Sequence, residues 1–232
     1  MKEETAADSA IPSKIDVGEA GRVSALWLAP AKPRACYVFA HGAGAGMTHA
    51  SMAGFAAGLA SREVATLRFQ FPYMEKGGRR TDSPAVAHAT VRAAVDAAAG
   101  LAPGVPLFAG GRSFGGRMTS QAQAESPLPG VRGLAFVGFP LHPAGKPGTA
   151  RADHLSRIEV PMLFLQGTRD ELASLDLLNP VVDALGANAT LEFFDDADHS
   201  FHVRVRSGRN DAQVLDDMLD ATVAWMANLL AH

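Results

Sequence analysis

Only one cysteine, Cys36, occurs among the 232 residues, so the chain cannot form a disulfide with itself. Cys36 lies within the apolar run ACYVFA, which favours a buried thiol over a reactive one. Net charge is also low, because 21 basic and 24 acidic side chains leave a formal charge of −3. This balance excludes an overall electrostatic attraction to nucleic acid or to an anionic membrane surface.

Long hydrophobic runs are absent as well, and no stretch approaches the roughly 18 apolar residues needed to span a bilayer. The first residues, MKEETAADSAIPSKID, lack the apolar segment of a secretory signal. The histidines show no metal-ligand spacing to cysteine or aspartate. We therefore expect a cytoplasmic protein with no metal ion, no organic cofactor, no membrane contact and no nucleic-acid partner. The sequence leaves the oligomeric state open.

Short apolar runs bounded by Gly, Pro or Asp predict seven strands, at 22–29, 35–40, 64–71, 105–110, 131–139, 160–167 and 189–196. Segments of helical period lie between them, at 49–61, 83–99, 115–125, 172–185 and 209–230. This alternation predicts an α/β fold with a mainly parallel central sheet of about seven strands flanked by helices. Because nothing resembles a linker, we expect residues 18–232 to form one domain, preceded by a flexible N-terminal arm at 1–17.

A serine lies between paired glycines directly after the strand expected at 105–110. Gly111-Arg112-Ser113-Phe114-Gly115 matches G-x-S-x-G and leads into an expected helix. A nucleophilic serine in this motif occupies a sharp strand-to-helix turn, where neighbouring side chains would collide with the backbone. The motif and its setting predict that Ser113 is a nucleophile.

Such a serine needs an acid and then a histidine, in that order along the chain. Asp170 follows the strand expected at 160–167, and His199 follows the next strand. Other candidates exist: the acids Glu171, Asp195, Asp196 and Asp198, and His202 as an alternative base. We favour Asp170 because it alone lies in the loop after the strand that precedes the strand of the histidine.

Backbone N–H groups must also stabilise the negative oxygen that develops during acyl transfer. The segment FAHGAGAG (39–46) follows a strand, and the amides of Ala43 and Phe114 are the candidates for this oxyanion hole. His41 is expected to hold this loop in place. A dinucleotide-binding loop is the competing interpretation of GAGAG, but Met47 stands where the third glycine belongs and the next strand lacks a terminal acid.

With these motifs, residues 20–232 resemble the α/β-hydrolase superfamily. The segments LRFQFPYMEKGGRRTDSP, GGRSFGGRM, GFPLHPAGKP and LFLQGTRDEL are similar to the testis-expressed-thirty type of hydrolase domain, also found in a subunit of a histone-acetyltransferase complex. Dienelactone-hydrolase-like enzymes are close relatives. The resemblance implies a serine hydrolase fold, with some relatives acting as scaffolds. Phe114, the residue after the serine, departs from the pattern of these domains, in which methionine is more frequent at this position.

The expected function is hydrolysis of small carboxylic esters, with lactones and thioesters left open, through a Ser113–His199–Asp170 triad and an acyl-enzyme. The alternative is a catalytically silent scaffold of the same fold. The segment 140–159 is too short for a lid domain, which favours small substrates. Substrate-lining candidates in the strand-end loops are Phe71, Tyr73, Met74, Leu141, His142 and Phe201.

Six basic residues are expected at the same face of the sheet: Lys76, Arg79, Arg80, Lys146, Arg151 and Arg169. Such a basic rim could recruit substrates that carry a carboxylate or phosphate. A solvated surface with pairing acids such as Glu75 and Asp82 is the competing interpretation.

Overall fold

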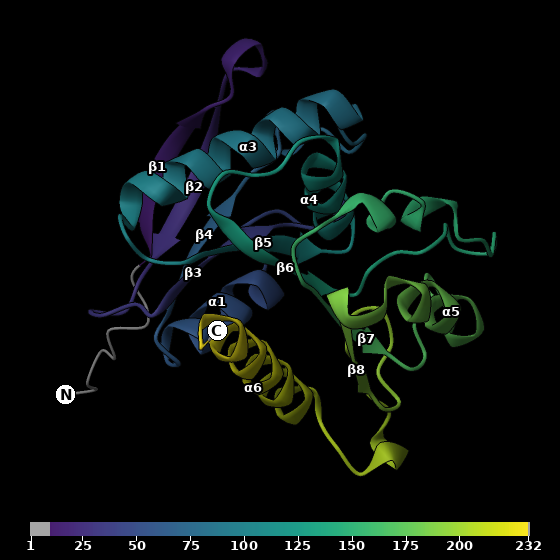
Figure 1. Cartoon of the computed structure of the whole chain (residues 1–232). Coiled ribbons are helices and arrows are strands. Elements are labelled where there is room, and N and C mark those ends of the chain that lie inside the picture. The colour runs from purple at the N-terminus through teal and green to yellow at the C-terminus, as the bar shows by residue number, and fades with distance from the viewer. Residues whose placement is uncertain (1–9, 232) are drawn as a thin grey trace.

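The computed structural model describes residues 10–231, and an eight-stranded sheet forms its centre, in the order β1-β2-β4-β3-β5-β6-β7-β8 (Figure 1). Strands β3 to β8 run parallel, whereas β1 and β2 are antiparallel to their neighbours. The strands are β1 (Ile11–Asp16), β2 (Arg22–Leu28), β3 (Ala35–Ala40), β4 (Val64–Phe69), β5 (Leu107–Arg112), β6 (Val131–Val137), β7 (Met162–Gly167) and β8 (Ala189–Phe194). The predicted α/β fold and all seven predicted strands are confirmed.

Helices cover both faces of the sheet. Helices α3, α4 and α5 lie on one face, while α1 and α6 lie side by side on the other (Figure 1). The bounds are α1 (Ala50–Ala60), α2 (Pro72–Glu75), α3 (Pro84–Leu101), α4 (Phe114–Glu125), α5 (Leu175–Leu185) and α6 (Asp211–Leu230). Within residues 10–231, every helix falls short, in length or in apolar character, of what crossing a bilayer demands.

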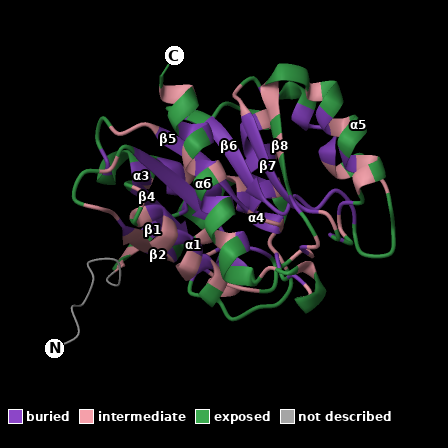
Figure 2. Ribbon diagram, turned by 90° about the horizontal axis from the view of Figure 1, so that it is seen from below, coloured by how far each residue is buried: buried purple, intermediate pink, exposed green. Residues whose placement is uncertain are grey.

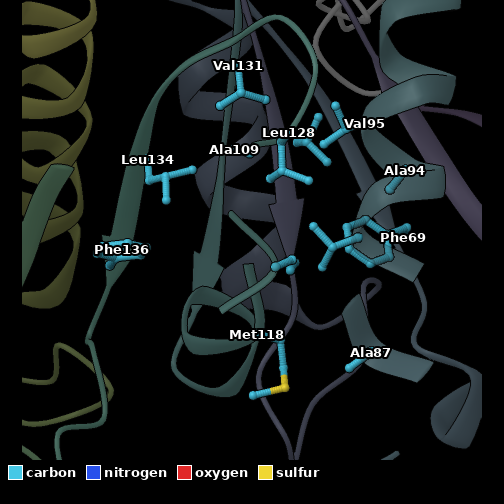
Figure 3. Packing of buried hydrophobic residues seen from close by; sticks show 14 of the residues in the cluster. Phe69, Ala87, Ala94, Val95, Ala109, Met118, Leu128, Val131, Leu134 and Phe136 are labelled. Carbon is cyan, nitrogen blue, oxygen red and sulfur yellow. The ribbon is translucent and has the colours of Figure 1, made fainter. Parts of the chain in front are cut away.

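Two apolar layers hold the helices on the sheet. Every residue of β3, β4 and β7 is buried, as expected for strands covered on both faces (β4 and β7 in Figure 2). Alanines of α3, including Ala87 and Ala94, let this helix approach the sheet closely, and Met118 of α4 extends the same layer (Figure 3). Trp225 of α6 packs against Phe108 in the opposite layer. These layers fix the ends of the parallel strands, where the candidate site lies.

The N-terminal segment differs from the expectation of a flexible arm at 1–17. Residues 1–9 lie outside the described residues, but Ile11–Asp16 form the edge strand β1 and pair antiparallel with β2. Ile15 and Val17 are buried in the layer that contains α3, which explains why this segment is ordered. The polar start of the sequence concealed an alternation in which only every second side chain faces the core.

The connection from β6 to β7 contains two short 3₁₀ helices, Ala150–Ala152 and Leu155–Arg157. No longer element lies within it, so the face above the strand ends carries no lid domain in this part of the chain.

The short helix α2 was not predicted from the sequence. It begins at a proline, Pro72, which suits the first turn of a helix.

Candidate active site

Ser113 occupies the sharp turn between β5 and α4. Its backbone has φ 49° and ψ −114°, a conformation that residues other than glycine adopt only when the surroundings enforce it. The Ser113 N–H donates to the Val137 carbonyl over 3.0 Å, which ties the turn to β6. The strained turn therefore presents the serine side chain beyond the carboxyl ends of the strands.

The glycines around Ser113 are needed because the turn packs tightly on β3. A Cβ atom at Gly111 or at Gly115 would lie 2.5 Å from the Ala40 carbonyl oxygen. That oxygen belongs to the backbone of a central strand and cannot move aside. The G-x-S-x-G spacing thus reflects the space that this turn leaves on each side of the serine.

Three side chains from three separate loops meet at this turn. His199 Nε2 lies 2.9 Å from Ser113 Oγ, and His199 Nδ1 lies 2.7 Å from Asp170 Oδ2. The carboxylate can only accept, so Nδ1 carries the proton and donates to Asp170, while Nε2 accepts from the serine hydroxyl. The structure brings together the three residues that the sequence order singled out, in a connected chain of hydrogen bonds.

Asp170 is held by donors that sequence reasoning did not find. Its side chain is fully buried, and Oδ1 accepts the Leu172 N–H over 2.8 Å. Gln166, at the end of β7, donates its side-chain amide to Asp170 Oδ2 and accepts the Phe139 N–H over 3.1 Å. A buried glutamine within the apolar strand MLFLQG is the signal that could have identified this residue.

The imidazole ring of His199 is positioned by its surroundings as well. Gly138 has φ +68°, and a Cβ there would lie 3.4 Å from His199 Cε1, so the ring packs directly on glycine backbone. The Arg112 guanidinium reaches the His199 carbonyl over 3.5 Å. Burial lowers the pKa of Arg112, and the charges of Asp198 and Asp170 oppose this shift.

The alternative acids and the alternative base have other contacts. Asp196 pairs with Arg204 and Arg169, and Asp198 accepts the N–H groups of Ser200 and His202. Glu171 and Asp195 are exposed. The largely exposed His202 lies 2.9 Å from Asp211, which raises the pKa of this imidazole by hydrogen bonding to its charged form.

The loop between β3 and α1 carries the predicted oxyanion-hole amide of Ala43. Tyr73 Oη donates to the Ala43 carbonyl over 2.8 Å. His41 Nδ1 donates to the Gly42 carbonyl over 2.7 Å, and His41 Nε2 accepts the Phe71 N–H over 3.0 Å. Burial lowers the pKa of His41 to about 4, so the ring is neutral and braces the loop. Within residues 10–231, the N–H groups of Ala43 and Phe114 donate to no other group.

A pocket of about 330 Å³ opens beside Ser113. It is lined by Ala43, Thr81, Ser113, Phe114, Arg117, Pro140, Pro143, Ala144, Arg151 and Leu172. Both residues predicted for the oxyanion hole therefore face the same space as the serine. A second hollow of about 270 Å³ borders His199 itself and is lined by Arg169, Glu171, Leu172, Asp198, His199 and Ser200.

None of the six residues expected to line the substrate pocket is among these lining residues. Phe71 and Leu141 are completely buried, and Met74 packs against the same core layer. Tyr73 contributes its hydroxyl to the Ala43 loop and not to the pocket. These side chains turn inward because the loops that carry them cover the ends of the apolar layers.

The other two expected lining residues also serve the fold. His142 Nδ1 donates to the Pro143 carbonyl over 3.0 Å and is almost fully buried. Phe201 stacks edge-on against Phe194 at 5.7 Å and borders a separate pocket between α1 and α6. In their place, the wall of the pocket beside Ser113 includes Pro140, Leu172, Arg117 and Arg151.

A mainly parallel sheet with a strained serine turn after β5, and an acid and a histidine after β7 and β8, defines the class of α/β hydrolases. The chain belongs to the alpha/beta hydrolase domain family, whose model matches residues 33–227. Across residues 10–231, no three His, Cys, Asp or Glu side chains are grouped closely enough to hold a metal ion.

Solved structures share this fold along almost the whole chain. XC6422 from Xanthomonas campestris, described as an α/β serine hydrolase without a lid, is 19% identical with a TM-score of 0.74, covering 94% of this chain and 95% of that one. Dienelactone hydrolase from Anabaena variabilis is 18% identical with a TM-score of 0.76, covering 95% and 97%. Est1E from Butyrivibrio proteoclasticus is 16% identical with a TM-score of 0.71, covering 97% and 100%. At these identities the likeness is one of fold.

Proposed function

We propose that this protein is a serine hydrolase that cleaves small carboxylic esters, or the chemically similar lactones and thioesters, through an acyl-enzyme. The observation that carries the proposal is the placement of the His199 imidazole, 2.9 Å from Ser113 Oγ and 2.7 Å from Asp170 Oδ2. This geometry lets one ring remove the proton of a nucleophile while a carboxylate fixes its tautomer.

The first half of the reaction transfers the acyl group to the enzyme. Ser113 Oγ attacks the ester carbonyl carbon while its proton passes to His199 Nε2, and the carbonyl electrons move onto oxygen. When the tetrahedral intermediate collapses, the bond to the leaving alcohol breaks and His199 gives that alcohol the proton. Asp170 stabilises the imidazolium that forms between these two steps.

The second half returns the enzyme to its starting state. A water molecule loses a proton to His199 and attacks the acyl carbon, and Ser113 leaves with the proton that His199 returns. In both halves the negative oxygen lies where the Ala43 and Phe114 amides can donate to it. One such donor contributes roughly 100- to 1,000-fold to the rate in well-studied hydrolases.

The size of the pocket supports small substrates. Its volume of about 330 Å³ is at the lower end of the range of about 300–1,000 Å³ found for small-molecule sites. The β6–β7 connection adds no apolar cover above it. A long acyl chain would leave most of its apolar surface in water, so a short acyl group fits this site better.

A fluorophosphonate probe tests this proposal against the silent scaffold of the same fold. We expect stoichiometric labelling on Ser113, located by mass spectrometry, and no labelling of Ser113→Ala. Ser120 provides a matched control, because its Oγ lies 2.7 Å from His154 Nε2 in a second, buried Ser–His pair. Ser120→Ala should keep the label. A folded wild-type protein that remains unlabelled would favour the scaffold.

The hydroxyl of Tyr73 is predicted to support the rate through the oxyanion loop. Tyr73→Phe removes the donor to the Ala43 carbonyl, and the loss of about 1 kcal/mol should lower kcat on a 4-nitrophenyl ester about 3- to 10-fold. Tyr37→Phe is the matched control, since Tyr37 Oη donates to the Ala135 carbonyl over 2.7 Å inside the core. It should lower the melting temperature but leave kcat within about twofold. Equal effects of both variants on kcat would contradict the prediction.

The finer assignments are also proposals. We propose that the chain lies with the testis-expressed-thirty type of hydrolase domain, on the strength of the sequence segments around Phe71, Ser113 and Asp170. We propose a cytoplasmic location, which is supported by the single cysteine, Cys36, buried as a free thiol. A small-molecule ester is the proposed partner.

A further inference from the structure

Two arginines line the pocket that contains Ser113. Arg117 lies one turn after Ser113 on α4, and Arg151 lies in the 3₁₀ helix Ala150–Ala152. Both are half-buried. Among residues 10–231, neither guanidinium forms a hydrogen bond or an ion pair with a carboxylate. The lining of the pocket contains no acidic side chain.

Placing two unpaired cations in one pocket is unfavourable without an anion. Burial lowers the pKa of Arg117, and the neighbouring positive charge of Arg151 lowers it further. Burial also lowers the pKa of Arg151. The ring of Phe114, 6.0 Å from Arg117 Cζ, offers only a weak cation–π contact. An oxyanion between the two groups would relieve both the repulsion and the lost hydration.

The hollow lined by Ser113 and the hollow lined by His199 differ in charge. The hollow on the His199 side is lined by the acids Glu171 and Asp198, and its arginine, Arg169, already contacts Asp196. His199 must protonate the leaving oxygen, so the alcohol part of an ester belongs on this side. The acyl part then extends into the pocket lined by Arg117 and Arg151.

We propose that the acyl group of the substrate carries an oxyanion, held by Arg117 and Arg151 while Ser113 attacks the ester carbonyl. The inference rests on the proposed hydrolase function and specifies its substrate class: short monoesters whose acyl chain ends in a carboxylate or a related oxyanion. A guanidinium group presents donors in a planar fork that matches such oxyanions. Of the six residues of the expected basic rim, only Arg151 lines this pocket, and Arg117 takes the place of the others.

Two esters that differ only in charge test this proposal. The monoester of adipic acid with 4-nitrophenol carries a terminal carboxylate, and the 4-nitrophenyl ester of adipamic acid, the monoamide, carries an uncharged amide of nearly the same shape. We expect wild-type kcat/KM to be at least about tenfold higher for the anionic ester after subtraction of spontaneous hydrolysis. Adipate and inorganic phosphate, tested as inhibitors of the neutral ester, distinguish a carboxylate site from a phosphate site.

The variants Arg117→Gln and Arg151→Gln each remove one guanidinium group. Each should lower the ratio of anionic to neutral kcat/KM about tenfold, whereas Arg151→Lys, which keeps the charge, should lose less. Arg157→Gln is the matched control, because Arg157 is an exposed arginine on the same connection and does not line the pocket. It should leave the ratio unchanged. Arg151 lies on a loop, so its variants test the proposal even if Arg117→Gln fails to fold.

The outcomes separate this inference from the hydrolase proposal. Equal wild-type rates on both esters, a ratio that no arginine variant changes and no inhibition by either anion would overturn the oxyanion site and leave the hydrolase standing. If neither ester is cleaved, thermal stabilisation by adipate or phosphate that is lost in Arg151→Gln would retain the anion site and reject the hydrolase. Absence of both cleavage and stabilisation would reject both.

Discussion

Ser113→Ala and His199→Ala are each expected to lower kcat on a neutral 4-nitrophenyl ester by about 10⁶-fold. Ser113 supplies the attacking oxygen, and His199, 2.9 Å away, accepts its proton, so either loss stops the same step. The double variant should therefore be no slower than the single variants, because the two groups act as one unit. The comparison is made by measuring the rate of each variant after its folding has been checked.

His202→Ala is the control for the histidine variant. This residue lies three positions further along the same loop, but its ring is mostly exposed and pairs with Asp211. It should keep kcat within about threefold of wild type, as expected for a surface substitution. A Ser113→Ala protein that retains a tenth of the wild-type rate would place the chemistry elsewhere.

The sequence predicted the sheet because its strands have a strong local signal. Strands β3, β4 and β7 are buried on both faces and therefore appear as continuous apolar runs. β1 gave no such signal, since it is an edge strand with mostly exposed side chains, and only Ile15 and the adjacent Val17 contact the core. Edge strands depend on their partner for pairing, which a single sequence does not display.

The meeting of Ser113, Asp170 and His199 was predictable from topology. Each follows a parallel strand, and the carboxyl ends of β5, β7 and β8 lie at the same edge of the sheet. The direction of a loop side chain was not predictable in this way. Phe71 and Leu141 occupy loops at that edge, yet both point into the core because hydrophobic burial outweighs exposure in the pocket.

Arg117 was missed although its spacing carried information. It lies four residues after Ser113, and residues four apart on a helix share one face, so the pocket beside Ser113 was within its reach. Gln166 was missed because its role depends on Asp170, four residues later, folding back on it. The nucleophile and its partners follow from motifs, whereas the groups that orient them and bind substrate follow from packing between distant segments.

Asp170→Asn is expected to lower kcat by about 10⁴-fold with little change in KM. Three donors point at the carboxylate: the Leu172 N–H, the Gln166 amide and His199 Nδ1–H. An asparagine has only one acceptor oxygen, so its NH₂ group must face at least one of these donors. If it faces His199, the imidazole adopts the other tautomer, Nε2 carries the proton, and the ring can no longer accept the proton of Ser113.

The tautomer itself provides the decisive measurement. Nitrogen NMR of the imidazole should report Nδ1–H in the wild type and Nε2–H in Asp170→Asn. Glu171→Gln is the matched control, because it removes a neighbouring, exposed carboxylate and should keep kcat within about twofold. An Asp170→Asn protein that is folded, keeps the Nδ1–H tautomer and still loses the full rate would mean that Asp170 acts through its charge. Retention of the rate would show that His199 needs no partner to work as the base.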